Sequence, residues 1–389
     1  MPEWSLFSRD ESARLSGGMR LSSLRGVVRH LGVDTAVVET PYTEVAYART
    51  APGCGLVAQR DGRREISGVV GSERTMGWDA ERGRPTILVK LVGDNVHPAD
   101  RLVYPDPTRA GDDQTSADFW SLTGPASTAM WQLVNANLGP AARAERRVPR
   151  AYMGADPGVG TARVWQAQFE PVLDACARIS ALSSPSPGLR ATSTADGLRY
   201  EVYAPRDLSG QVRFSADLRN LVAFEYSEVA PSVTYAIAAG QGDQRNRIRR
   251  AATSTNPLDL RWGRRIERYL DRRDEPDATK LQQYAADEVE SGQGQVNLAC
   301  TLTDSEAATY GVHWGLGDRT SVQVGLKGQT KVAVVVDLVR EILLEVDNSG
   351  KEKIQPAIGG FDAKAIRPTP TQQQLAQVGR SLSEFFTRK

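Results

Sequence analysis

Cysteine and histidine are scarce in this chain of 389 residues, with three of each. The cysteines, Cys54, Cys176 and Cys300, lie too far apart for a CxxC motif. An odd count without a secretory signal argues against a disulfide framework, so we expect buried free thiols. The histidines are equally scattered, so a zinc site would have to gather its ligands from distant segments.

Long apolar runs and an excess of one charge are missing as well. The most apolar run, Val332–Val339, contains Asp337 and falls well short of the length that spans a membrane. Residues 1–15 lack the apolar core of a secretory signal, so we expect synthesis and folding in a reducing host cytoplasm. Lys and Arg number 48 against 47 Asp and Glu, a net charge of +1, whereas a free nucleic-acid-binding protein would carry a clear basic excess.

Catalytic motifs are absent from the sequence, which contains no GxSxG, Walker GxxxxGK[ST], GxGxxG or HExxH. His97 lies between Asp94 and Asp100, but Pro98 and the loop context favour solvated side chains over a metal site. Adjacent carboxylates do not flank a common substrate as glycosidase carboxylates do; these are Asp112 with Asp113 and Asp274 with Glu275. We therefore predict no enzyme activity, no catalytic, cofactor-binding or metal-binding residues, and no cofactor.

The first hundred residues have the pattern of antiparallel β-structure. Strands are predicted at 56–60, 66–70 and 86–92, with Asp61-Gly62 as a tight turn between the first two. The two prolines of Tyr104-Pro105-Asp106-Pro107 end the ladder. Further strands are predicted at 200–204, 212–214, 221–226, 233–239, 296–302, 320–324, 332–336 and 340–346. Residues 331–346 are long enough for two strands or for one long bent strand.

Three other segments have helical periodicity. Residues 125–138 begin with a proline and end before Gly139-Pro140. Residues 168–182 place Cys176 on their apolar stripe, which indicates core packing rather than a nucleophile. Residues 277–290 begin at Asp277 as the N-cap.

Two further segments suggest contacts with other chains. Residues 245–273 hold ten arginines interleaved with acidic residues, a mixture that favours an ion-paired subunit interface or a solvated face over a phosphate groove. Beyond the spacer formed by Pro368 and Pro370, Thr371–Phe386 predicts an amphipathic helix. A helix this short needs packing for its stability, so we expect it to dock onto another chain or a neighbouring copy. Folding back onto its own subunit is the alternative.

A series of short segments occurs in a specific order and spacing. They are Gln59-Arg60-Asp61-Gly62, Ser67-Gly68, Val92-Gly93-Asp94-Asn95, Arg101-Leu102-Val103-Tyr104-Pro105-Asp106-Pro107, Thr123-Gly124-Pro125-Ala126, Asn137-Leu138-Gly139-Pro140, Pro205-Arg206-Asp207, Phe214-Ser215, Leu218-Arg219-Asn220-Leu221, Ala230-Pro231, Trp262-Gly263-Arg264-Arg265, Tyr310-Gly311, Leu316-Gly317-Asp318 and Pro356-Ala357-Ile358-Gly359. Together, from about residue 20 to 360, they resemble the central baseplate-hub (tail-associated, tail tip hub) proteins of long-tailed siphophages that infect actinobacteria.

The resemblance implies a mixed, β-rich α+β fold. It would contain two tail-tube-like antiparallel β-barrels, an inserted α+β layer and a C-terminal helix. The first barrel would comprise 1–107, and the second 206–240 plus 296–360. The inserted domain would comprise 108–205 plus 241–295, and the linker and helix 361–389. Leu316-Gly317-Asp318 predicts a turn that opens a barrel strand, because glycine permits a positive φ there.

The function implied by the resemblance is mechanical. Three copies would form a baseplate or tail-tip hub that adapts a six-fold tail tube to a three-fold tip and lines the DNA exit channel. Its partners would be two further copies, the distal tail protein or tail tube above, the C-terminus of the tape measure protein, and tip or receptor-binding proteins or fibres below. DNA would pass through the lumen during ejection. The protein would reside in the virion, at the phage tail tip, and take part in host attachment.

Two alternative functions stay open, a tail-tip cell-wall hydrolase and a host-carbohydrate-binding module. Because the chain ends at Lys389, shortly after the resemblance does, we expect no room for a hydrolase domain. A carbohydrate-binding module would need grouped exposed aromatic residues. The sequence does not group its candidates, which are Trp4, Trp78, Trp120 and Trp314.

Overall fold

The computed structural model describes residues 3–78, 83–302, 308–325 and 333–359, which form two compact units. The first unit is built from Met1–Ala223 and Cys300–Ile358, and the second from Phe224–Ala299. Strands β14 (Leu221–Val229) and β18 (Gln295–Leu302) carry the chain across the two boundaries. The predicted C-terminal helix at Thr371–Phe386 lies outside the described residues.

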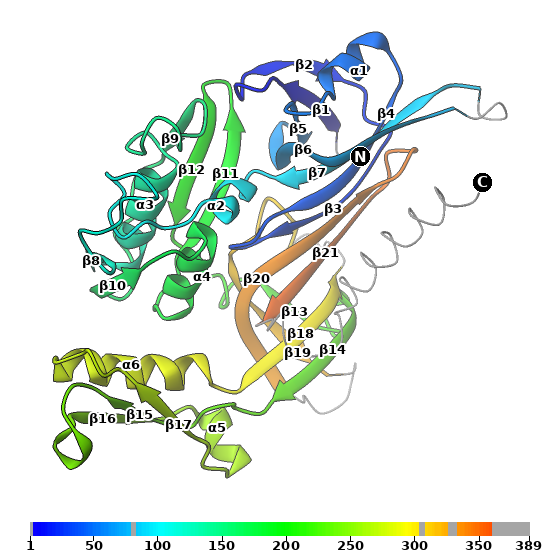
Figure 1. The fold of residues 1–389 in the computed structure, drawn as a ribbon. Coiled ribbons are helices and arrows are strands. Elements are labelled where there is room, and N and C mark those ends of the chain that lie inside the picture. The colour runs from blue at the N-terminus through cyan, green and yellow to red at the C-terminus, as the bar shows by residue number, and fades with distance from the viewer. Residues whose placement is uncertain (1–2, 79–82, 303–307, 326–332, 360–389) are drawn as a thin grey trace. The chain divides into compact units, whose positions relative to one another are not determined.

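Most strands of the first unit belong to one large sheet, which is antiparallel except for the parallel pairing of β13 with β19 (Figure 1). From β21, the order of its strands is β21-β20-β3-β4-β7-β6-β5-β1-β2, and β19 adds to β20 and pairs with β13. Their bounds are β1 (Trp4–Arg9), β2 (Leu15–Met19), β3 (Ser23–Arg29), β4 (Thr35–Pro41), β5 (Gly55–Arg60), β6 (Arg63–Gly77), β7 (Thr86–Gly93), β13 (Arg213–Phe214), β19 (Arg319–Val324), β20 (Ala333–Val346) and β21 (Glu352–Gly359). Two short helices lie between its strands, α1 (Glu44–Arg49) and α2 (Val96–Asp100).

The alternation of apolar and polar residues along each strand decides which face of this sheet is buried. In β7 every second residue is buried, including Ile87, Val89 and Leu91. A strand with this period of two presents one apolar face to the core and one more polar face outward. The Asp61-Gly62 turn between β5 and β6 is confirmed, with a positive φ at both residues.

The strand-rich α+β fold class is confirmed, but the sheets are not closed barrels. Strand β20 pairs with β3 from Glu341↔Arg29 to Val346↔Leu24. This ladder joins strands assigned to the first predicted barrel to strands assigned to the second, so both lie in one open sheet. Residues 333–346 form one strand rather than two. The four-part division of the chain stays a prediction.

A second layer of the first unit contains two helices, α3 (Ala126–Asn137) and α4 (Val172–Ala181), beside two small sheets (Figure 1). The sheets comprise β8 (Trp120–Gly124) with β10 (Arg163–Ala167), and β9 (Ala151–Met153) with β12 (Gly197–Tyr203) and β11 (Gly188–Thr194). α3 matches its predicted range to within one residue at each end, whereas α4 begins at Val172, four residues after the predicted start, because Pro171 is its N-cap; Phe169 therefore lies outside the helix. The apolar stripes of the two helices meet in one core, where Met130, Leu133, Cys176 and Ile179 are fully buried.

The second unit is a three-stranded sheet with a helix along one face (Figure 1). Its strand order is β16 (Arg249–Thr253), β15 (Tyr235–Ala239) and β17 (Glu267–Asp271), and α6 (Ala278–Ser291) packs on it. Asp277 caps α6 as predicted, since its carboxylate accepts a hydrogen bond from the Thr279 amide. The sequence predicted no helix or strand within the arginine-rich segment 245–273. The structure places β16, α5 (Pro257–Trp262) and β17 there, and the 3-10 turn η1 (Gln244–Asn246) at its start.

Strands β1 to β4 and β8 to β11 were not predicted individually. Their short, glycine-containing and mixed sequences give weak periodicity, and long-range pairing stabilises them. None of the helices in the described ranges combines the length and the apolar character needed to cross a membrane.

Candidate functional site

A buried ion pair lies where β1, β6 and the end of β7 meet. Arg9 leaves 3% of its side chain exposed and Asp94 leaves none. Both nitrogens of the Arg9 fork donate to the Asp94 carboxylate, one of them at 3.1 Å, and the Ser67 hydroxyl donates to the same carboxylate at 2.5 Å. A buried charge needs such pairing, so these three residues fix the relative positions of three strands.

A second polar cluster joins β6 to the segment before β19. The Tyr310 hydroxyl donates to Glu65 at 2.6 Å, and Arg63 donates to the other oxygen of that carboxylate at 2.6 Å. The Arg63 guanidinium also lies 4.7 Å from the centroid of the Tyr310 ring. Burial raises the pKa of Tyr310 well above its ordinary value, so the phenol stays a donor at neutral pH. The Tyr310 ring packs edge-on against Trp314.

A third cluster holds the turn at residues 316–318. Arg206 donates two bonds to the Asp318 carboxylate, at 2.9 and 2.5 Å, which is the forked geometry that arginine favours. Asp318 also accepts a bond from the Gly315 amide at 2.8 Å. Gly317 has φ +81°, as the sequence predicted, and a Cβ there would lie 2.3 Å from the Tyr203 hydroxyl oxygen.

These clusters border a cavity of about 750 Å³ within the first unit. Its lining is polar and contains arginine and carboxylate side chains from both layers, including Arg64, Arg199 and Glu201. Asn95 reaches it with 5% exposure, and its side-chain oxygen has no hydrogen-bond partner among the described residues. The cavity therefore offers both donors and acceptors to an occupant.

Two titratable groups near the cavity have altered pKa values. Burial, with the neighbouring Asp94 carboxylate, raises the pKa of Asp34 to about 7, although its bond from the Arg29 amide acts in the opposite direction. Burial lowers the pKa of His30 to about 4, and the charge of Arg340 acts in the same direction. One ring nitrogen of His30 shares a 2.7 Å hydrogen bond with the Tyr203 hydroxyl.

The carboxylates of these clusters are occupied by structural partners. Asp94, Glu65 and Asp318 each bind an arginine, so all three carboxylates take part in contacts that connect parts of the fold. His313, predicted to be structural, accepts a bond from the Thr309 amide at 3.0 Å. Within the described ranges, no three His, Cys, Asp or Glu side chains gather closely enough to hold a metal ion.

The three cysteines are free, but they differ in exposure. Cys176 and Cys300 are buried, and burial raises the pKa of both, that of Cys300 to about 12. Cys54 was also expected to be buried, yet it is only partly covered because it lies in the turn that leads into β5.

The four candidate tryptophans occupy different environments. Trp314 is 2% exposed and Trp78 is 68% exposed. Trp4 and Trp120 are half-buried, and the Trp4 indole donates to Glu352. They do not form a common platform for a sugar.

In the second unit, several arginines of the segment 245–273 form ion pairs with carboxylates of the same segment. Arg247 and Arg273 both pair with Asp271, and Arg265 pairs with Glu267 at 2.6 Å. These pairs form within the unit, with Arg247 mostly buried and Arg265 and Arg273 largely exposed, and a role in subunit contact stays a prediction.

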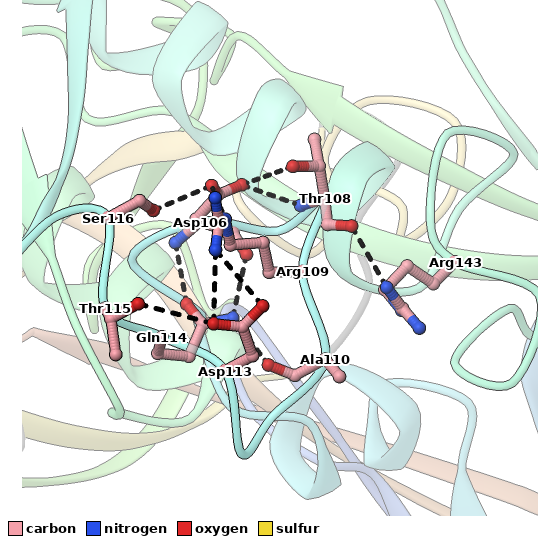
Figure 2. A network of polar contacts seen from close by, with 9 residues as sticks. All are labelled: Asp106, Thr108, Arg109, Ala110, Asp113, Gln114, Thr115, Ser116 and Arg143. Atoms are coloured by element: carbon pink, nitrogen blue, oxygen red, sulfur yellow. Dashed lines mark hydrogen bonds and ion pairs between the residues drawn. The ribbon is translucent and has the colours of Figure 1, made fainter.

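The segment after Pro105 is an ordered surface loop (Figure 2). Asp106 accepts bonds from Thr108 and from the Ser116 hydroxyl, the latter at 2.8 Å, and Gln114 bonds to the backbone on both sides of the loop. Arg109 pairs with Asp113. These side-chain and backbone bonds hold the loop in place.

Several segments of the sequence resemblance converge around the cavity. Ser67, Asp94, Arg206, Tyr310 and Asp318 all come from those segments and supply the bonds described above. Their partners Arg9 and Glu65 gave no signal in the sequence, because nothing local distinguishes them from exposed charges.

Comparison with known proteins gives matches to one family and to solved structures. The family model described as Siphovirus ReqiPepy6 Gp37-like protein matches residues 4–360. A search of curated proteins gave no match to this chain.

Three solved structures share the fold. The 43 kDa tail protein of prophage MuSo2 from Shewanella oneidensis has 12% identity and a TM-score of 0.54, over 92% of this chain and 98% of that one. A tail protein from Neisseria meningitidis MC58 has 12% identity and a TM-score of 0.52, over 92% and 96%. Prophage tail protein gp18 from Listeria monocytogenes EGD-e has 11% identity and a TM-score of 0.52, over 97% and 99%.

Proposed function

This chain belongs to the Siphovirus ReqiPepy6 Gp37-like protein family, and on that premise we propose that it is a structural protein of a siphophage tail. The observation that carries the proposal is the family match over residues 4–360, joined to a fold that this chain shares with prophage tail proteins over at least 92% of its length. Its place would be the virion.

Within the tail, we assign it to the hub at the distal end. Three copies would adapt the six-fold tube to a three-fold tip and line the path of DNA. Contacts would include the tube or distal tail protein above, the tape measure protein, and the tip or receptor-binding proteins below.

A mechanical role also agrees with the chemistry of the polar clusters. A hydrolase needs carboxylates that are free to act on a substrate. Here the carboxylates of Asp94, Glu65 and Asp318 are paired with Arg9, Arg63 and Arg206. The pairs of Arg9 with Asp94 and of Arg206 with Asp318 connect segments that are far apart in the sequence, and Tyr310 does the same for Glu65, so these contacts stabilise the arrangement of elements rather than prepare a reaction.

Electron microscopy of the intact tail tip tests the proposal. We expect three-fold density into which the first unit fits, adjacent to the last ring of the tube. Two-fold or six-fold copies of this chain would contradict the hub, and absence of the chain from purified tails would contradict any structural role. Incubation with purified cell walls should leave their turbidity unchanged.

Binding of a host saccharide is a second candidate, favoured by the polar cavity of about 750 Å³. Its lining includes Tyr203 together with paired arginine and carboxylate side chains, which are groups that hydrogen-bond hydroxyls. Tyr310 and Trp314 are buried, however, and offer no open ring face. A glycan array decides between the two: specific binding that an Arg64→Gln change abolishes would favour the saccharide.

A further inference from the structure

One exposed surface of the first unit is apolar and contains arginine; we name it the arm surface. It consists of Val45 and Tyr47 on α1, and Arg74, Met76 and Trp78 at the end of β6. Val45, Met76 and Trp78 are 57%, 55% and 68% exposed. The Arg74 guanidinium lies 4.0 Å from the centroid of the Tyr47 ring and donates to the Tyr47 carbonyl at 2.7 Å, which joins the two elements. Alternation along β6 places Arg74 and Met76 on one face.

A cavity of about 450 Å³ lies beside the arm surface. Pro41, Tyr42 and Pro85 line it with apolar atoms, and the exposed residues Arg20 and Arg84 line its rim. Neither arginine forms an ion pair with a described residue. Among the described residues, this end of the unit therefore combines an apolar hollow with two exposed arginines that form no ion pair, while Glu44 on α1 is the exposed acidic residue beside Val45.

A second exposed surface, on the other layer of the unit, is apolar and acidic; we name it the loop surface. Its apolar residues are Leu102, Phe119 and Phe169, which are 43%, 42% and 51% exposed. The pairing of β8 with β10 ends at Trp120↔Ala167. Phe119 lies just before Trp120 and Phe169 shortly after Ala167, so both lie at this end of the ladder. The Phe169 amide donates to the carbonyl of the residue after Leu102, which brings the third side chain to this end.

Phe169 is held in an unusual backbone conformation, with φ +45°. A positive φ is costly for an aromatic residue, and such strain persists only where the surroundings enforce it. Here the hydrogen bond from its amide and the ring contact with Tyr104 hold the residue. An exposed aromatic side chain fixed in this way has little entropy left to lose on binding.

The charge of the loop surface is opposite to that of the arm surface. Figure 2 shows that Arg109 is engaged with Asp106 and Asp113 inside the loop. Asp112 and Asp118 are exposed, and neither forms an ion pair within the described ranges. Asp118 places an exposed negative charge directly before Phe119, and Asp112 adds a second exposed carboxylate in the loop, where the charge of Arg143 attracts it.

We propose that the arm surface of one copy of this chain binds the loop surface of a second copy. Both surfaces hold aromatic or arginine side chains of the kind that dominate interface energies, and the exposed Arg20 and Arg84 are opposite in charge to the exposed Asp112 and Asp118. The hollow beside the arm accepts an aromatic ring from the loop surface. Because the two surfaces are different, the contact is head-to-tail, and such a contact forms a ring when the rotation between copies closes, as it would in a trimer. This inference rests on the proposed trimer and names the faces that form it.

Charge reversal in the full-length chain tests the pairing. The arm variant carries Arg20→Glu and Arg84→Glu, and the loop variant carries Asp112→Lys and Asp118→Lys. Each alone should weaken self-association at least ten-fold in sedimentation velocity, because like charges then face each other. A chain with all four changes should regain most of the wild-type association. The matched control, Arg14→Glu with Asp196→Lys, reverses exposed charges outside both surfaces and should change nothing.

The outcomes separate this inference from the proposed function. An oligomer that survives both reversals overturns the pairing of these surfaces but leaves the trimer in place. Loss of association without rescue in the four-fold variant also overturns it. A wild-type chain that stays monomeric overturns the pairing and the trimer together. Trp78→Ala gives a second measurement, since it should weaken association without changing charge, and circular dichroism confirms that each variant is folded.

Discussion

Removing the buried carboxylate at Asp94 gives the sharpest test of how the first unit is held together. Asp94→Ala leaves the Arg9 guanidinium, with 3% of its side chain exposed, without its carboxylate partner. It also removes the acceptor of the 2.5 Å bond from Ser67. Breaking a buried ion pair by deleting one partner typically costs about 3–5 kcal/mol. We expect a loss of that size in the free energy of unfolding, measured by urea denaturation.

A double-mutant cycle isolates the pairing itself. Arg9→Met and Asp94→Leu replace both charges with apolar groups of similar size, a change that is often neutral or stabilising. The double variant should therefore lose much less than the sum of the two single variants. The coupling between the two positions should exceed about 1 kcal/mol, as expected for residues in direct contact.

A surface ion pair provides the control. Arg25 and Glu345 are 2.7 Å apart on β3 and β20, with 45% and 20% of their side chains exposed. Removing Glu345 should cost less than about 1 kcal/mol, because solvent screens such a pair. If Asp94→Ala costs no more than Glu345→Ala, or if the two changes in the cycle are additive, the buried pair does not hold the three strands together as we argue.

Three further predictions concern pH, backbone strain and thiol exposure. The pKa of Asp34 is raised to about 7 in the folded state against 3.8 unfolded, so the free energy of unfolding should fall as pH rises from 4 to 7. The fall caused by this one group should not exceed about 4 kcal/mol, measured by urea titrations at each pH. Asp34→Asn should abolish it. Gly317→Ala should lower stability by about 1–3 kcal/mol, visible as a lower melting temperature, because φ is +81° and a Cβ would meet a tyrosine hydroxyl at 2.3 Å. A thiol reagent should modify only Cys54 in the folded protein and all three cysteines after denaturation; rapid labelling of Cys176 would contradict the buried core.

Periodicity determined the parts of the fold that local physics decides. The helices α3, α4 and α6 were predicted because each carries an apolar stripe with a recognisable start or stop, such as Asp277 or Gly139-Pro140. The turns at Asp61-Gly62 and Gly317 were predicted because glycine is needed where φ is positive. Short-range signals of this kind reach only a few residues along the chain.

Only the tertiary structure decided how the strands join and what the charged residues do. β20 pairs with β3 across more than 300 residues of sequence, so two predicted barrels became one open sheet. The sequence marked Asp94 and Asp318 as parts of recurring segments, but it gave no sign of Arg9 or Glu65, whose neighbours are ordinary. Burial, not residue type, makes these charges structural, and burial depends on chain segments brought together from far apart.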